Sequence, residues 1–139
     1  MPVPSEYQRA SQDFEKFMLD AREAAGLTTT HQTYTMVQAV FQTFRRRLTV
    51  SDAIRFAQVL PPVLRALFVA DWGTDEQQRR FEDRSVMTAE VKSLRAEHNF
   101  APDTAIRDVA VALRKNIPAS DLDRVLAQLP QGAAEYWAA

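Results

Sequence analysis

The chain repeats one segment of its own sequence, and this repeat constrains the fold more than any other feature. Residues 51–61 read Ser-Asp-Ala-Ile-Arg-Phe-Ala-Gln-Val-Leu-Pro, and residues 120–130, 69 positions later, read Ser-Asp-Leu-Asp-Arg-Val-Leu-Ala-Gln-Leu-Pro. Five of these eleven positions hold the same residue. The match also extends backwards at the same spacing, from 44–48 (Phe-Arg-Arg-Arg-Leu) to 113–117 (Leu-Arg-Lys-Asn-Ile). An internal repeat of this length predicts two copies of one structural unit.

Apolar residues recur at intervals of three and four along both halves, which is the period of a helix buried on one face. The clearest runs span 34–48 and 106–117. Only three glycines occur in 139 residues, which disfavours an all-β fold because tight β-turns use glycine. We therefore predict an all-α fold of about eight helices in two tandem pseudo-equivalent helical repeats, approximately 14–72 and 85–137, packed as one compact helical bundle domain. The charged stretch 73–84 lacks the composition of a flexible linker and is predicted to be a helical connector.

Both copies of the repeated segment begin with Ser-Asp, at 51–52 and 120–121. Serine at a helix cap with aspartate in the first turn is the ordinary start of a helix, so we predict capping rather than catalysis at these pairs. An arginine follows at the same place in each copy, as Arg55 and Arg124. Each can pair with the aspartate three residues earlier or bind an anionic ligand, and the sequence leaves both interpretations open.

Several packing motifs together resemble one known family. They are Gly26-Leu27, the stripe 37–48, the segment from Ser51-Asp52 to Leu60-Pro61, the apolar run 64–68, and the second-half counterparts that end at 128–130 and Tyr136-Trp137. From about Phe14 to Trp137 the chain resembles the DUF2267 family, a bacterial domain of unknown function. The resemblance implies the helical fold and assigns no chemistry. The chain departs from the family pattern at Val59, where a glutamine would precede Leu-Pro, and in the triplet Arg45 to Arg47.

The residues that most chemistry needs are missing or poorly spaced. The chain has no cysteine, which excludes disulfides and thiolate chemistry. Its two histidines, His31 and His98, have no acidic residue three or four positions before them, so we expect no metal site. Three scattered glycines cannot form a phosphate-binding loop. We therefore expect no catalytic residue and no cofactor, and we disfavour an enzyme.

Two further expectations concern the location of the protein. No apolar stretch approaches the roughly 20 residues that a membrane span needs. Residues 1–6 lack both a basic start and an apolar run, so we expect no secretory signal and a cytoplasmic protein. The formal net charge of −1 gives no overall attraction to nucleic acid or to an anionic membrane.

By elimination, the leading hypothesis is a non-enzymatic protein-interaction or assembly module that binds a protein partner, or a second copy of itself, through its surface. The candidate surface consists of cations and aromatic residues, namely Arg45, Arg46, Arg47, Arg55, Trp72, Arg79, Arg80, Arg124 and Trp137. One alternative is nucleic-acid binding through the helix end at Arg45 to Arg47. Another is an enzyme or small-molecule binder with a pocket between the two halves, lined by Arg55 and Arg124.

Overall fold

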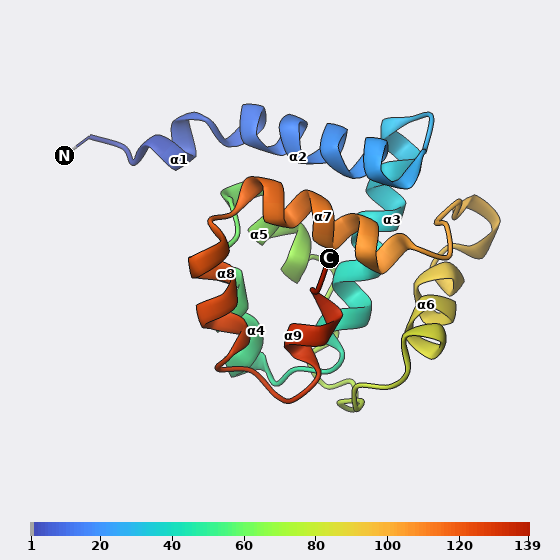
Figure 1. Ribbon diagram of the computed structural model, residues 1–139. Helices are drawn as coiled ribbons and strands as arrows, with labels where there is room; N and C mark the ends of the chain where they lie inside the picture. The colour runs from blue at the N-terminus through green and yellow to red at the C-terminus, as the bar shows by residue number, and fades with distance from the viewer. Residues whose placement is uncertain (1) are drawn as a thin grey trace.

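The chain folds into helices that enclose a single core (Figure 1). In the computed structural model, which describes residues 2–139, the first half contains α1 (Ser5–Gln8), α2 (Ala10–Ala25), α3 (Thr30–Arg45), α4 (Val50–Ala57) and α5 (Pro62–Val69). The second half contains α6 (Arg84–Ser93), the 3₁₀ turn η1 (Ala96–His98), α7 (Ala105–Asn116), α8 (Ala119–Leu126) and α9 (Ala133–Tyr136). No strand occurs in this described part of the chain. The all-α prediction is confirmed.

Helices α2 and α3 set the arrangement of the bundle. Helix α2 lies along α7 across one side of the molecule, and α3 runs through the body, where it packs against α6, α5 and α7 (Figure 1). The stripe on α3 is buried as its spacing predicts, with Val37, Phe41 and Phe44 fully inaccessible to solvent. Since α3 is central, the residues at its end meet elements from both halves.

An aromatic cluster joins the last residues of the chain to the first half. Trp137 stacks on Phe56 with ring centroids 5.6 Å apart, and it also contacts Phe44 at 5.3 Å. The hydroxyl of Tyr136 donates a 2.7 Å hydrogen bond to the main-chain oxygen of Val40 in α3. The predicted place of Trp137 on an interaction surface is wrong, because its side chain is fully buried in this cluster. Large aromatic side chains provide much of a core's apolar burial, which explains why the chain end is held inside.

The internal repeat has one clear structural counterpart. Helices α4 and α8 are each eight residues long and begin 69 positions apart, at Val50 and Ala119. Helices α3 and α7 differ, with 16 and 12 residues. The equivalence of the two halves as structural units stays a prediction.

The helical connector predicted over 73–84 is wrong. Residues 70–83 contain no helix, and α6 begins only at Arg84. This segment runs across the end of α3, where the amide of Arg79 donates to the oxygen of Arg46 at 2.9 Å. The guanidinium of Arg47 donates a 3.1 Å hydrogen bond to the main-chain oxygen of Arg80. These contacts hold the segment against α3, and because most of its residues are exposed, water can satisfy the backbone groups that lack a helical partner.

The predicted serine caps are also wrong. Helix α4 is capped by Thr49, whose hydroxyl accepts the amide of Asp52 at 3.1 Å, so that Ser51 falls inside the first turn. Helix α8 follows Pro118 and has no side-chain cap, and Ser120 likewise lies in the first turn. No helix in residues 2–139 is long and apolar enough to cross a membrane.

Candidate functional site

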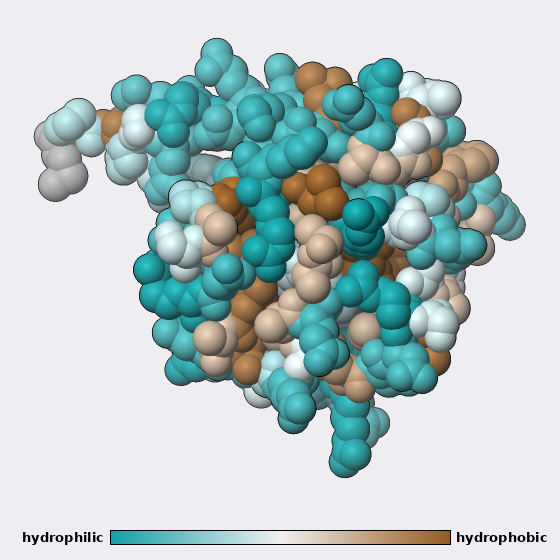
Figure 2. Space-filling model, in the orientation of Figure 1, coloured by the Kyte–Doolittle hydropathy of each residue, from teal (hydrophilic) through white to brown (hydrophobic). Residues whose placement is uncertain are grey.

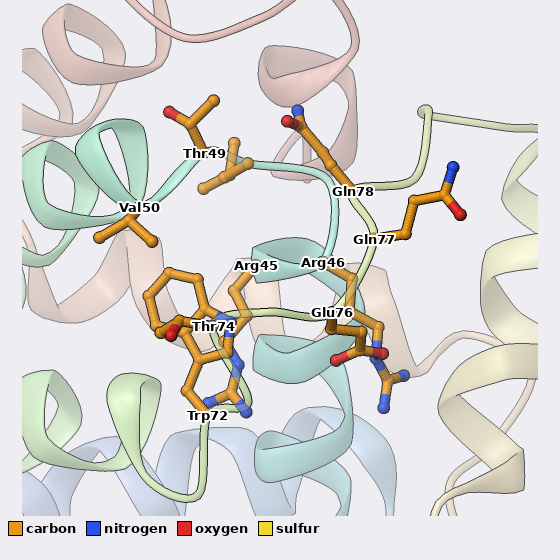
Figure 3. Close-up of a pocket in the computed structure, with 10 residues that line it drawn as sticks. Arg45, Arg46, Thr49, Val50, Trp72, Thr74, Glu76, Gln77 and Gln78 are labelled. Atoms are coloured by element: carbon orange, nitrogen blue, oxygen red, sulfur yellow. The ribbon is translucent and has the colours of Figure 1, made fainter.

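The predicted arginine triplet lies where α3 ends, and its first member points back into the protein. Arg45 donates to the main-chain oxygens of Phe68 (2.9 Å), Ala70 (2.7 Å) and Asp71 (3.2 Å). Its guanidinium lies 5.4 Å from the ring centroid of Trp72, over the ring face (Figure 3). These oxygens lie in the last turn of α5 and in the two residues after it, where helix carbonyls lack intrahelical partners. Arg45 therefore closes that helix end and is not available to an external ligand.

Arg47 is the most deeply buried cation of the described chain, with 1% of its surface exposed. It donates to the main-chain oxygen of Thr43 at 2.7 Å and to the Glu82 carboxylate at 3.0 Å. It also makes a two-pronged contact with Glu90, with its Nη1 at 3.0 Å and its Nη2 at 3.1 Å from the two carboxylate oxygens. A bidentate pair of this kind is the arrangement that best repays the desolvation of a guanidinium.

Glu90 of α6 is the centre of this ion cluster. Besides Arg47, it accepts from Arg46 at 3.2 Å and from Arg79 at 2.8 Å, while only 10% of its side chain is exposed. Burial alone would raise the pKa of Glu90, but the hydrogen bonds and positive charge of Arg47, followed by Arg46 and Arg79, hold that pKa below its usual value. The carboxylate is thus kept ionised, and it connects the end of α3 to the second half.

The charges of this cluster balance one another. Arg46, Arg47 and Arg79 face Glu90, Glu82 and also Glu76, which lies 3.3 Å from Arg46. The adjoining cavity, lined by Arg45, Arg46, Thr49, Trp72 and Glu76 among others, measures about 120 Å³ (Figure 3). That volume is well below the roughly 300–1,000 Å³ of ordinary ligand pockets. The predicted basic patch is therefore wrong at Arg45 and Arg47, which are buried and satisfied inside the protein.

Arg55 and Arg124, the two arginines of the repeat, each pair with the aspartate three residues earlier. This pairing is one of the two interpretations that the sequence left open. Arg55 lies 3.5 Å from Asp52, and Arg124 lies 3.0 Å from Asp121, in both cases across one helical turn. Both arginines are exposed, so each pair contributes little to stability.

A second site lies between α2 and α3, and it is mostly apolar. It is a groove of about 450 Å³ lined by Phe14, Glu15, Met18, Leu19, Thr30, His31 and Tyr34, and we call it the α2–α3 groove. Leu19 and Tyr34 keep 55% and 39% of their surfaces exposed. Figure 2 shows hydrophobic patches along the edge formed by α2, within a largely hydrophilic surface.

Local sequence explains how the two walls of the groove are set. Gly26 ends α2 in a left-handed conformation, with φ of 68°, which residues with a Cβ adopt at a cost. Thr29 then starts α3 with a reciprocal capping box to Gln32. The short turn between them folds α3 back against α2, and Leu19 and Tyr34 both line the groove between the two helices.

Comparison with known proteins places the whole bundle in one family. Residues 14–136 match the family model described as "Uncharacterized conserved protein (DUF2267)". The chain belongs to the DUF2267 family. The resemblance drawn from the packing motifs is thereby confirmed, and no curated protein matches the chain. The DUF2267 match begins at Phe14, so it includes the groove walls and the ion cluster but leaves α1 outside.

Sequence reasoning missed the groove of this DUF2267 domain, although one signal was present. Leu19 falls outside the stripe of Phe14, Phe17, Met18 and Ala21, and an apolar residue off the buried face of a helix is a candidate contact. Tyr34 fitted the stripe of α3 and was expected to be buried, but it is exposed at the first turns of that helix.

The other predicted surface residues lie apart from this groove. Trp72 is half-buried against Arg45, and Arg79 and Arg80 lie on the extended segment before α6. Arg55 and Arg124 lie on α4 and α8.

Proposed function

We propose that this DUF2267 chain is a non-enzymatic protein-interaction module that acts through the α2–α3 groove. One observation supports the proposal above all: the groove is open, apolar and flanked by two large exposed side chains, Leu19 and Tyr34. Exposed apolar surface that is contiguous and rimmed by polar groups is typical of interaction sites.

The groove offers enough apolar surface to attract a partner side chain. Full burial of one large apolar side chain is worth roughly 1.5–3 kcal/mol. Tyr34 combines a rigid ring with a polar tip, which is the character of residues that dominate binding energy in interfaces. A partner that inserts one aromatic or aliphatic side chain between Leu19 and Tyr34 would bury surface on both sides at once.

The two alternative functions gain less support. Nucleic-acid binding relied on Arg45 and Arg47, whose guanidinium groups are already occupied by protein oxygens and carboxylates. A pocket between the halves would require open space where Trp137 stacks on Phe56. The groove is therefore the better-supported site.

Site-specific photo-crosslinking in the native host tests this function. A photoreactive phenylalanine analogue replaces Tyr34 in one version and Val50, an exposed apolar residue of α4, in the control version. We expect a covalent protein adduct from position 34 that Leu19→Glu abolishes without changing the circular dichroism spectrum. Absence of an adduct at position 34, or equal adducts at both positions, would refute the proposal.

A further inference from the structure

The N-terminal segment of the chain projects beyond the bundle (Figure 1). We call residues 3–9, which include α1, the arm. No residue of α1 is buried, and the arm exposes two apolar side chains, Val3 at 57% and Tyr7 at 50%. Half of the surface of Tyr7 is therefore open to contact with another molecule.

The arm cannot reach the groove of its own chain. Tyr7 and Leu19 are 12 residues apart on a helix that is interrupted only at Arg9, where φ is −99° and ψ is 9°. A helix rises 1.5 Å per residue, so the two side chains stay about 18 Å apart. An apolar arm and an apolar groove on the same rigid element can therefore meet only between two molecules.

The charges of the arm and the groove favour one relative direction. Tyr7 is flanked by Glu6 and Arg9, and the α2 wall of the groove carries Glu15 near one end and Arg22 one turn beyond the other. In an antiparallel alignment, Arg9 of one copy meets Glu15 of the other while Glu6 approaches Arg22. In a parallel alignment, Glu6 would meet Glu15 and Arg9 would meet Arg22, which is repulsive at both ends.

These charges are available for a contact between copies. Glu15 and Arg22 form no ion pair among residues 2–139. Arg9 lies 3.8 Å from Asp13, and Glu6 lies 3.5 Å from Arg65, in pairs that remain open to solvent. Exposed pairs of this type contribute little, so exchanging them for contacts with a second copy costs little.

We propose that the arm of one chain docks antiparallel into the α2–α3 groove of a second copy, with Tyr7 inserted between Leu19 and Tyr34. Exchanging the two chains leaves an antiparallel arrangement unchanged. The arm of the second chain therefore enters the groove of the first chain through the same contacts. The assembly is therefore a closed two-fold dimer rather than a filament. This inference rests on the proposed function, because it names the partner of the same groove.

The contact area is small, which determines how the dimer must be detected. An interface made by two short arms falls at the low end of the range, below about 1,200 Å² in total, where complexes are weak and transient. We expect association that depends on protein concentration. A covalent trap is then the most sensitive assay, and the absence of any cysteine in the chain makes one simple to build.

The trap pairs Val3→Cys in one sample with His31→Cys in another. In the antiparallel alignment the start of the arm lies at the Arg22 end of the groove, which is also the end where α3 begins and where His31 lies. These positions leave Tyr7 and the charged groups unchanged. After mixing under mild oxidation, we expect at least tenfold more 3–31 disulfide than 3–50 disulfide from the matched control mixture with Val50→Cys. Equal yields would overturn the arm-in-groove contact.

A charge exchange tests the direction of docking in the wild-type background. Arg9→Glu alone and Glu15→Arg alone should each weaken dimerisation at least fivefold by analytical ultracentrifugation. The combined variant should restore it, because the opposite charges are exchanged. Failure of the combined variant to recover, with both single variants still folded, would overturn the antiparallel alignment.

The two proposals can fail separately. If the photoreactive group at position 34 captures another protein and no 3–31 disulfide forms, the groove is an interaction site but its partner is not a second copy. If neither the adduct nor the disulfide forms, the interaction function itself is refuted.

Discussion

Removal of the Glu90 carboxylate is the sharpest test of how the two halves are held together. Glu90→Ala leaves the guanidinium of Arg47 buried, with Glu82 and two main-chain oxygens as its remaining partners. Arg46 keeps its ion pair with Glu76, and about half of the Arg79 side chain is exposed to water. Neither arginine is therefore left with a buried, unpaired charge. The loss is therefore concentrated on Arg47.

The expected magnitude follows from that burial. Removing one partner of a buried ion pair costs roughly 3–5 kcal/mol, because the other charge stays desolvated. Since Glu82 still neutralises part of the Arg47 charge, we expect the low end of this range, about 3 kcal/mol. For a chain of this size that corresponds to a fall in melting temperature of about 10 °C.

Urea denaturation followed by circular dichroism at 25 °C measures this loss, and a double-mutant cycle identifies its cause. The cycle compares Glu90→Leu, Arg47→Met and the double variant. The double variant should be more stable than Glu90→Leu alone, because it no longer buries an unpaired charge. A loss below about 1 kcal/mol for Glu90→Ala, or strictly additive effects in the cycle, would refute the assignment of Glu90 as the centre of a buried cluster.

The pH dependence gives an independent check on the same residue. The pKa of Glu90 is lower in the folded chain than its usual value of 4.5, so the unfolded chain takes up the proton first as the pH falls. The stability that Glu90 contributes is complete above pH 4.5 and is lost as the pH falls through the folded pKa. The difference in unfolding free energy between the wild type and Glu90→Gln should therefore shrink as the pH is lowered from neutral, and a constant difference would contradict the ion pairing.

Four further substitutions test the packing. Gly132→Ala should destabilise the chain by more than about 1 kcal/mol, because φ there is +105° and a Cβ would lie 2.7 Å from Phe81, as urea titration can measure. Gly26→Ala is the matched control, with φ of +68° and open space around its Cβ, and should cost about 1 kcal/mol or less. Tyr136→Phe should cost about 1 kcal/mol by the same assay, because it removes a buried hydrogen bond to the main-chain oxygen of Val40, which keeps its partner within α3. Burial raises the pKa of Asp108, so Asp108→Asn should stabilise the chain at pH 7, and calorimetry should find this gain reduced as the pH falls.

The parts of the fold that the sequence predicted are those set by local spacing. The stripe on α3, from Val37 to Phe44, is buried because residues three and four apart share one face of a helix wherever that helix packs. The eight-residue helices α4 and α8 begin 69 positions apart, which is the spacing of the repeated segment in the sequence. Their exact starts were wrong by two residues in both helices, since Thr49 and Pro118 precede them where serines were expected as caps two positions later.

Apart from Leu19, which lies off the apolar stripe of α2, the sequence contains no sign of the groove, because exposure depends on what lies nearby in space. Leu19 and Tyr34 each belong to a helix with a well-formed apolar stripe. The sequence of one helix does not indicate which of its apolar residues the neighbouring helix leaves uncovered. The arm was unpredictable for the same reason, since Tyr7 continues the period of α2 past the end of the bundle.

The arginine triplet shows why a run of charge in a sequence does not define a charged surface. Arg45 finds its acceptors 23 to 26 residues away, and Arg47 finds Glu90 43 residues away. The segment from Glu76 to Glu90 supplies three carboxylates to three of the nearby arginines, so the local sum is close to zero although the triplet alone carries three positive charges. The distances that decide this balance arise from the path of the extended segment across the end of α3. That path was predicted to be helical, and a helix from 73 to 84 would have changed which of these side chains could face Glu90 and Arg47, so the error in the connector and the error in the basic patch have one cause.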